Sequence, residues 1–459
     1  MPGRPDDTRR IVIVGASLAG LRAAVTLRKE GFGGDLTIVG DEADPPYDRP
    51  PLSKVVLSGV VPADHTVLPH LGPLAGTRWL LGTPAARLDR GASEVVLADG
   101  SRVPYDLVLI ATGVRNRPWP HEEQAKLRGV CGIRTRGDAA NLARLLAGGA
   151  RRVVVVGAGF TGSEVASVCR HRGIGVTVVE RGEEPLAGAL GGVVGAVAAD
   201  LHRRNGVDLR CGITVQALDG TGGTFRGATL SDGSTVEADV AVIALGAIRN
   251  TEWLAGSGLA ASPLGVAADA GGRAIGVNGL VTDDVYVAGD VARFPHALFG
   301  YEFLSLEHWE NAMVGAEVAA HNMICPPLER RPHVCVPTFW STQFGVNIKS
   351  AGVPSLADKI VITQGRPEAA SFAAAYGNGR GQIVGAVTFN HGRWLDYYRD
   401  LIERASPLPG PVDDGLPADP QPARFPDPGV PYHGPTVVVT GHSPTQMEAI
   451  RVPAGRSAP

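Results

Sequence analysis

Apolar residues in this chain gather into short runs, and two of these runs are followed directly by a glycine-rich turn and a helix-forming segment. Residues 11–14, 36–39, 153–156 and 176–179 are such runs, four residues long and rich in β-branched side chains. Runs of this length and composition predict buried parallel strands rather than helices. Strand, glycine turn, helix and strand follow one another twice, so the chain is predicted to have an α/β fold.

The second of these units, residues 151–180, has the clearer dinucleotide signature. Gly157, Gly159 and Gly162 directly follow a strand with the spacing G-x-G-x-x-G. The first glycine permits a tight turn, the second lets a pyrophosphate approach, and the third lets the helix pack on the strand. Glu180 ends the next strand, where a carboxylate can bind both ribose hydroxyls and repel a 2′-phosphate. The unit is therefore predicted to bind NADH, whereas a plain βαβ unit would leave Glu180 unexplained.

The first unit has the sequence GASLAG at the same turn. Gly15 and Gly20 match the motif, but Ser17 stands in the place of the middle glycine and adds a small side chain near the pyrophosphate. Either Asp41 or Glu42 could be the ribose acid, and Asp41 is favoured by its position. Two dinucleotide units in one chain indicate one bound cofactor and one exchanging substrate.

A proline-rich loop, PPYDRPPLSK, occupies residues 45–54. Four prolines in ten residues forbid a helix or a central strand and predict a rigid, partly extended loop. Arg49 could clamp a phosphate, and Lys54 could carry its charge toward a ring system. The alternative is a solvated loop with two exposed cations.

The order of the remaining strands predicts that one unit is inserted into the other. Residues 105–113 (YDLVLIATG) and 238–246 (ADVAVIALG) are near copies, and residues 284–290 (DVYVAGD) are a third related run. The predicted architecture is two Rossmann-like domains, the second inserted in the first, plus a carboxy-terminal α+β domain. The predicted boundaries are 8–117 with 247–325 for the first, 118–246 for the second, and 326–405 for the third.

The end of the chain differs in composition from the rest. Residues 406–459 are dense in proline, glycine, alanine and aspartate. Such a segment cannot bury enough apolar surface to fold alone, so a disordered tail is predicted, with residues 435–440 as one candidate edge strand.

Composition and charge argue against several functions. The net charge of −3 over 459 residues argues against wholesale binding of nucleic acid or anionic membranes. No secretory signal is visible, and every apolar segment is interrupted well before the length of a membrane span. The five cysteines are widely spaced, which predicts reduced thiols in a cytoplasm and no metal site.

Eight motifs in order carry a family resemblance over about residues 8–405. They are GASLAG, PYDRPPLSK, IATG, GAGFTGSE, ALGAIRN, VYVAGDVARFP, LEHWENA and PTFWS. Together they resemble the FAD-dependent NADH:ferredoxin reductases of the putidaredoxin reductase and Rieske-dioxygenase reductase kind. These have the pyridine nucleotide-disulfide oxidoreductase fold without the redox disulfide.

The resemblance implies that the first domain binds FAD, which takes hydride from NADH. Single electrons would then pass to a 2Fe–2S ferredoxin that feeds a monooxygenase or dioxygenase. Lys54 and Glu164 would pair near flavin N5, and Trp340 would complete the catalytic set. A helix over residues 307–319 could point its amino terminus at the reduced flavin. The implied contacts with FAD and NADH are Gly15, Ser17, Gly20, Asp41, Arg49, Lys54, Thr112, Gly113, Gly157, Gly159, Gly162, Glu180, Gly246, Gly289, Asp290, Glu307, His308, Trp309 and Trp340.

Some residues depart from the family pattern. Ser305 stands where a basic residue is frequent, and Thr342 stands where an aspartate often follows FWS, so the choice of partner stays open. The chain has no C-x-x-x-x-C pair, so its electrons must leave the flavin for an external acceptor. Alternatives are an NADH oxidase or quinone reductase, or a redox-sensing protein related to apoptosis-inducing factor. The oligomeric state is left open between monomer and dimer.

Overall fold

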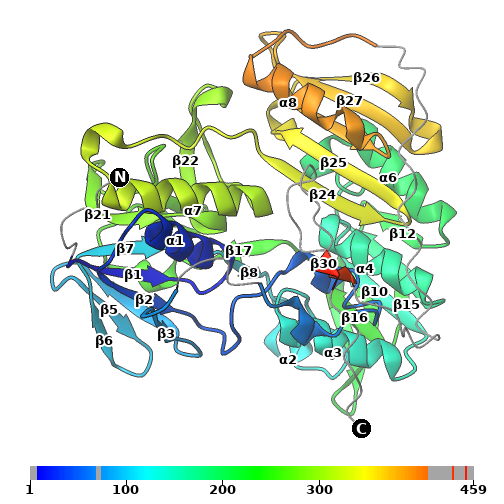
Figure 1. The fold of residues 1–459 in the computed structure, drawn as a ribbon. Helices are drawn as coiled ribbons and strands as arrows, with labels where there is room; N and C mark the ends of the chain where they lie inside the picture. Colours follow the sequence, from blue (N-terminus) through cyan, green and yellow to red (C-terminus); the bar gives the residue numbers. More distant parts are fainter. Residues whose placement is uncertain (1–7, 69–73, 412–436, 439–449, 452–459) are drawn as a thin grey trace. The chain divides into compact units, whose positions relative to one another are not determined.

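The computed structural model describes residues 8–68, 74–411, 437–438 and 450–451 (Figure 1). The chain forms two compact units. Unit 1 consists of Met1–Tyr47, Val67–Arg115 and Ala247–Phe339, and unit 2 of Asp48–Thr66, Asn116–Gly246 and Trp340–Pro459. Residues 48–54 of the proline-rich loop therefore belong to unit 2, although residues 45–47 and the strands before and after the loop belong to unit 1.

Unit 1 is built on a six-stranded sheet with the order β20-β21-β7-β1-β2-β3. β1 is paired in parallel with β2 and β7, and β7 with β21, while β20 runs antiparallel to β21. The parallel strands β1, β2, β7 and β21 therefore all end at the same edge of the sheet. The strands are β1 (Arg10–Val14), β2 (Asp35–Val39), β3 (Arg78–Leu80), β7 (Leu107–Ile110), β20 (Arg273–Ile275) and β21 (Val281–Val287).

Two helices, α1 (Leu18–Lys29) and α7 (Trp309–Ile324), share the core of this sheet. Their facing positions are mostly alanine, including Ala23 and Ala24 on α1 and Ala316 and Ala320 on α7. Small side chains let the two helices approach each other closely while both cover the apolar strands.

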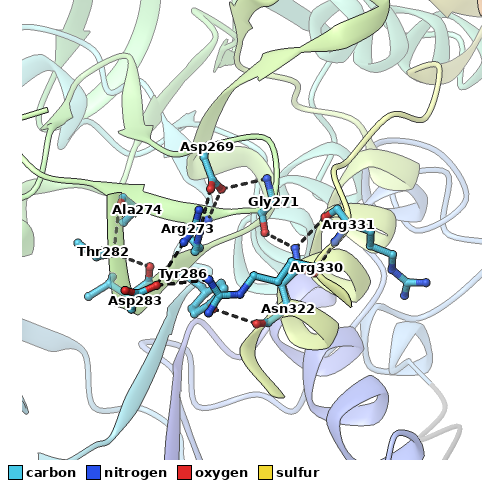
Figure 2. Close-up of polar contacts among 11 residues, drawn as sticks. Asp269, Gly271, Arg273, Ala274, Thr282, Asp283, Tyr286, Asn322, Arg330 and Arg331 are labelled. Carbon is cyan, nitrogen blue, oxygen red and sulfur yellow. Dashed lines mark hydrogen bonds and ion pairs between the residues drawn. The ribbon is translucent and has the colours of Figure 1, made fainter. Parts of the chain in front are cut away.

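The carboxyl end of α7 is fastened by polar contacts (Figure 2). Asn322 donates from Nδ2 to the carbonyl oxygens of Gly271 at 2.9 Å and Arg331 at 2.8 Å. The hydroxyl of Tyr286 donates to the carbonyl oxygen of Asn322 at 2.9 Å. On β20, Arg273 pairs with Asp269 at 2.9 Å. The segment after α7 is thereby held against the β20–β21 hairpin.

Smaller sheets complete unit 1. An antiparallel sheet has the order β4-β5-β6, and a four-stranded sheet has the order β18-β19-β22-β23. β8 (Val114–Asn116) and β17 (Ala247–Arg249) form a two-stranded sheet. The strands of the first two sheets are β4 (Ala85–Asp89), β5 (Glu94–Leu97), β6 (Arg102–Pro104), β18 (Ala261–Ser262), β19 (Gly265–Ala267), β22 (Ala292–His296) and β23 (Glu302–Leu304).

Unit 2 contains a parallel sheet with the order β12-β11-β10-β16-β9. Helix α4 (Phe160–His171) follows β10 directly, and an antiparallel sheet, β13-β14-β15, packs on the same core. The other elements are β9 (Val130–Cys131), β10 (Arg152–Val156), β11 (Gly175–Glu180), β12 (Asp208–Cys211), β13 (Val215–Thr221), β14 (Thr224–Leu230), β15 (Thr235–Glu237), β16 (Val240–Ile243), α2 (Glu122–Ala125), α3 (Arg136–Ala147), α5 (Ala187–Leu190) and α6 (Gly192–Arg204).

The carboxy-terminal part of unit 2 is an antiparallel sheet with the order β24-β25-β28-β27-β26, followed by helix α8 (Leu395–Glu403). Its strands are β24 (Thr338–Gln343), β25 (Val346–Gly352), β26 (Lys359–Arg366), β27 (Ser371–Gly377) and β28 (Ile383–Phe389). The predicted fold class, two Rossmann-like domains plus an α+β domain, is confirmed.

Two details differ from the sequence-based expectations. The proline loop was expected to exclude helix, yet Pro50–Ser53 form a 3-10 helix, η1, with proline in its first positions, where a helix tolerates it. The helix predicted over 307–319 begins at Trp309, because His308 is extended, and it continues to Ile324.

Of the tail, only short pieces lie within the described residues. β29 (Val437–Val438) pairs antiparallel with β30 (Ile450–Arg451). The other predictions for residues 412–459 fall outside the part of the chain that the structure describes.

Candidate functional site

In the turn between β1 and α1 of unit 1, close backbone packing requires glycine at two positions. Gly15 has φ +125°, and a Cβ there would lie 2.1 Å from the carbonyl oxygen of Ala111. A Cβ at Gly20 would lie 1.8 Å from the carbonyl oxygen of Gly15. Ser17, between them, is extended and precedes the first turn of α1, whose backbone N–H groups can face a pyrophosphate.

The turn of unit 2 has the same construction. A Cβ at Gly157 would lie 2.4 Å from the carbonyl oxygen of Ala244, and a Cβ at Gly162 would lie 2.0 Å from that of Gly157. A Cβ at Gly159 would meet nothing within 4 Å. The protein thus needs glycine at the first and third positions for its own packing. The middle position is the open side of a cradle that fits a pyrophosphate.

Glu180 lies beside this second turn. It ends β11, one residue past the Val156–Val179 pair. Its Oε2 accepts a hydrogen bond from the N–H of Ala158 at 2.6 Å, and its Oε1 from the N–H of Gly182 at 2.7 Å. The backbone therefore fixes the carboxylate before any ligand arrives, as a ribose site requires.

The corresponding acid of unit 1 is placed differently. Val14 pairs with Val39, so Gly40 holds the position that Glu180 holds in unit 2. A Cβ at Gly40 would lie 2.6 Å from Cβ of Ala16, which accounts for the glycine. Asp41 follows one residue later and is exposed. Its assignment to the adenosine ribose stays a prediction.

The small-residue turns predicted to contact cofactors follow buried strands. Thr112 and Gly113 come after β7, and Gly246 follows β16. Asn250, which was not predicted from the sequence, fixes the turn at Thr112 and Gly113 through two hydrogen bonds with Thr112. Its Nδ2 donates to the Thr112 carbonyl oxygen, and its own carbonyl accepts from Thr112 Oγ1, both at 2.8 Å.

Gly289 and Asp290 form the start of a 3-10 turn after β21. Gly289 has φ +75°, and a Cβ there would lie 3.0 Å from Cβ of Ala19, near the start of α1. The acid is therefore carried on the same edge of the sheet as the first glycine turn, as a contact with a bound dinucleotide would require.

The start of α7 gathers several predicted cofactor residues. Burial lowers the pKa of His308 to about 4, so the imidazole is neutral at neutral pH. Its Nδ1 is buried without a hydrogen-bond partner among the described residues. Glu307 pairs through Oε1 with Nη2 of Arg249 at 2.8 Å, and the sequence reading did not identify Arg249. Trp309, the first residue of the helix, is half-buried.

In unit 2 the proline loop and α4 meet through a buried ion pair. Nζ of Lys54 lies 2.8 Å from Oε2 of Glu164, and the two side chains are 17% and 7% exposed. Two hydroxyls also donate to this carboxylate, Ser53 Oγ to Oε2 at 2.5 Å and Ser341 Oγ to Oε1 at 2.6 Å. Neither serine was identified from the sequence. Trp340, beside Ser341 on β24, is half-buried.

Arginines brace the stretch Asp48–Thr66, which contains Arg49 and Lys54. Arg49 donates from Nη1 to the carbonyl oxygen of Arg134 at 2.9 Å. Arg136, at the start of α3, donates from Nε to the carbonyl oxygen of Ala63 at 2.9 Å. Two cationic side chains, Arg49 and Lys54, are thereby carried on one braced segment.

No group of three or more His, Cys, Asp or Glu among the described residues could hold a metal ion. All five cysteines are free thiols. Within the described part of the chain, no helix combines the length and apolar character that a membrane crossing needs.

Two family models match the chain. Residues 9–316 match pyridine nucleotide-disulphide oxidoreductase, and residues 338–421 match the reductase C-terminal family. The chain belongs to the pyridine nucleotide-disulphide oxidoreductase family.

Within that family, similar proteins are named as ferredoxin reductases. Rhodocoxin reductase of Rhodococcus erythropolis is 36% identical over 363 residues, which cover 77% of this chain and 80% of that protein. The ferredoxin–NAD(+) reductase component of the p-cumate 2,3-dioxygenase system of Pseudomonas putida is 31% identical, covering 93% and 98%. The reductase in the covalent putidaredoxin reductase–putidaredoxin complex has a TM-score of 0.80 and 28% identity, covering 87% and 94%.

Proposed function

We propose that this protein is an FAD-dependent NADH:ferredoxin reductase. It passes hydride from NADH to FAD and then single electrons to a 2Fe–2S ferredoxin that feeds a monooxygenase or dioxygenase. The observation that carries the proposal is the pair of turns in which the first and third glycines are required by close backbone packing, on two separate sheets of one chain. The relatives supply the partner, since two of them are named as reductases of oxygenase or redoxin systems.

Bound FAD supplies the chemistry that amino acids lack, accepting a hydride and releasing electrons one at a time. Gly15, Ser17 and Gly20 present the N–H groups of α1 to its pyrophosphate. Asp290 holds the ribitol chain, and Asp41 the adenosine ribose. The braced loop brings Arg49 and Lys54 to the cofactor as fixed cations.

NADH binds at the turn of unit 2. Gly157, Gly159 and Gly162 receive its pyrophosphate, and Glu180 accepts hydrogen bonds from its ribose hydroxyls. Because the Glu180 carboxylate is held by two backbone N–H groups, it cannot turn away from a 2′-phosphate. The repulsion therefore selects NADH over NADPH.

Lys54 and Glu164 act together during hydride transfer. Lys54 would supply positive charge that favours reduction of bound FAD, and Glu164 keeps that ammonium oriented. With FAD bound, Trp340 and Trp309 would cover its ring system and exclude water. At the start of α7, His308 stays neutral, so positive charge there comes from the helix terminus rather than from the imidazole.

We assign residues 8–117 and 247–325 to FAD binding, 118–246 to NADH binding, and 326–405 to the interface domain. The protein works in the cytoplasm, where the NADH pool is. Its oligomeric state, monomer or dimer, does not alter these roles.

The test is steady-state NADH oxidation by the purified holoenzyme with three acceptors, namely a 2Fe–2S ferredoxin, oxygen and a quinone. We expect turnover with ferredoxin to exceed the other two by at least about tenfold. Faster turnover with oxygen or quinone would support the oxidase alternative. Slow turnover with all three and a long-lived flavin–NAD complex would support a redox sensor.

A further inference from the structure

The carboxylate of Glu164 is held at both of its oxygens. Lys54 Nζ and Ser53 Oγ donate to Oε2, at 2.8 and 2.5 Å, while among the described residues Ser341 Oγ is the one donor to Oε1, at 2.6 Å. A glutamate carboxylate fixed at one oxygen can still rotate about χ3, the terminal side-chain torsion, whose distribution of angles is broad. Ser341 removes that freedom.

The direction of the Ser341 hydroxyl is itself determined. Gln343 donates from Nε2 to Ser341 Oγ at 3.1 Å. An amide N–H can only donate, so the single hydroxyl proton of Ser341 is left for Glu164. Ser341 and Gln343 are 1% and 0% exposed, so water does not compete for these contacts.

A second contact holds β24 to the same helix. The N–H of Phe344, just past β24, donates to Ser167 Oγ at 2.8 Å. Ser167 lies three residues after Glu164, one turn along α4. Phe344 has φ +50°, a conformation that costs free energy for a bulky residue and has to be held by its surroundings. Two successive turns of α4 therefore fix the end of this strand.

We propose that Ser341 is a positioning residue for flavin reduction, which holds Oε1 of Glu164 so that Oε2 aims the ammonium of Lys54. Lys54 has three N–H donors, of which one is directed to Glu164 and one to the carbonyl oxygen of Pro50 at 3.2 Å. The direction of the third is then set by the other two. This inference rests on the proposed role of Lys54 in reduction.

The experiment is anaerobic stopped-flow reduction of the FAD holoenzyme by saturating NADH. Ser341→Ala is expected to slow flavin reduction about fivefold, the effect expected from the loss of one neutral hydrogen bond. Ser341→Thr keeps the hydroxyl and should recover most of the rate. Ser58→Ala is the matched control, because Ser58 is a buried serine four residues past Lys54 whose hydroxyl donates to the carbonyl oxygen of Val55.

A second readout separates positioning from general loosening. In a Lys54→Met background, Ser341→Ala should add almost nothing, because Ser341 acts through Lys54. The midpoint potential of the flavin should fall in Ser341→Ala toward its value in Lys54→Met. If Ser341→Ala does not fold, Ser341→Cys, of nearly the same size but a poor donor, takes its place with the same expected loss.

The outcomes are distinguishable. If Lys54→Met slows reduction but Ser341→Ala does not, or if the two losses multiply fully, Ser341 is not a positioning residue while the role of the ion pair stands. If Lys54→Met reduces at the parent rate, the proposed role of Lys54 fails, and this inference fails with it.

Discussion

Lys54 Nζ lies 2.8 Å from Glu164 Oε2, although 110 positions separate the two residues in the chain. The pair joins the proline loop to helix α4 inside unit 2. Since both side chains are largely buried, each needs the other to offset its loss of hydration.

Replacing Lys54 and replacing Glu164 should destabilise the protein to different extents, because Glu164 has hydroxyl donors besides Lys54. In Lys54→Met, Glu164 keeps two hydroxyl donors, so the loss of unfolding free energy should be only about 2 kcal/mol. In Glu164→Gln, Lys54 loses its counter-charge, and the loss should be larger, about 3–4 kcal/mol. Urea unfolding followed by circular dichroism measures both. The double variant should lose less than the sum, and strictly additive losses would show that the residues are not coupled.

Replacing Gly162 should destabilise the fold, whereas replacing Gly159 should weaken NADH binding. Gly162→Ala should fail to fold stably, because its Cβ would lie 2.0 Å from the carbonyl oxygen of Gly157. Gly159→Ser reproduces the residue at the middle position of unit 1, so it should fold normally while raising KM for NADH about tenfold. Thermal unfolding and steady-state kinetics distinguish the two. Normal NADH binding by Gly159→Ser would remove Gly159 from the pyrophosphate site.

Glu180 should control the choice of nicotinamide cofactor. Glu180→Gln keeps the size of the side chain but removes the charge that opposes a 2′-phosphate, so the ratio of kcat/KM for NADH to that for NADPH should fall about tenfold or more. Most of the change should come from weaker NADH use, because the amide can accept from only one of the two N–H groups now bound. An unchanged ratio would place the ribose elsewhere.

His333, which is buried, and His308, which is half-buried with a buried Nδ1, predict a loss of stability in mild acid. Burial lowers the pKa of His308 and of His333 to about 4, below the ordinary value of 6.5. The unfolded chain therefore takes up protons first, and stability present above pH 6.5 is lost as the pH falls toward 4. Each histidine should cost about 1.4 kcal/mol per pH unit within that window. His333→Phe should flatten the dependence, and an equally steep curve in this variant would show that His333 does not contribute.

The sequence predicted those parts of the site that depend on local geometry. Gly157, Gly162 and Glu180 were identified because turn, helix and strand follow one another within thirty residues. Ser341 and Asn250 were not, because each acts on a residue more than a hundred positions away through a contact made only in the folded chain. Asp41 was chosen by spacing, and the strand register shows that Gly40 occupies the position equivalent to Glu180.

The central claim is that electrons from NADH leave this protein for a 2Fe–2S ferredoxin through one bound FAD. Anaerobic mixing of a catalytic amount of holoenzyme with NADH and excess oxidised ferredoxin tests it, with ferredoxin bleaching and NADH loss recorded together. The account predicts about two ferredoxins reduced per NADH consumed, since a hydride carries two electrons. Reduction of the flavin by NADH without bleaching of any 2Fe–2S ferredoxin offered would contradict it.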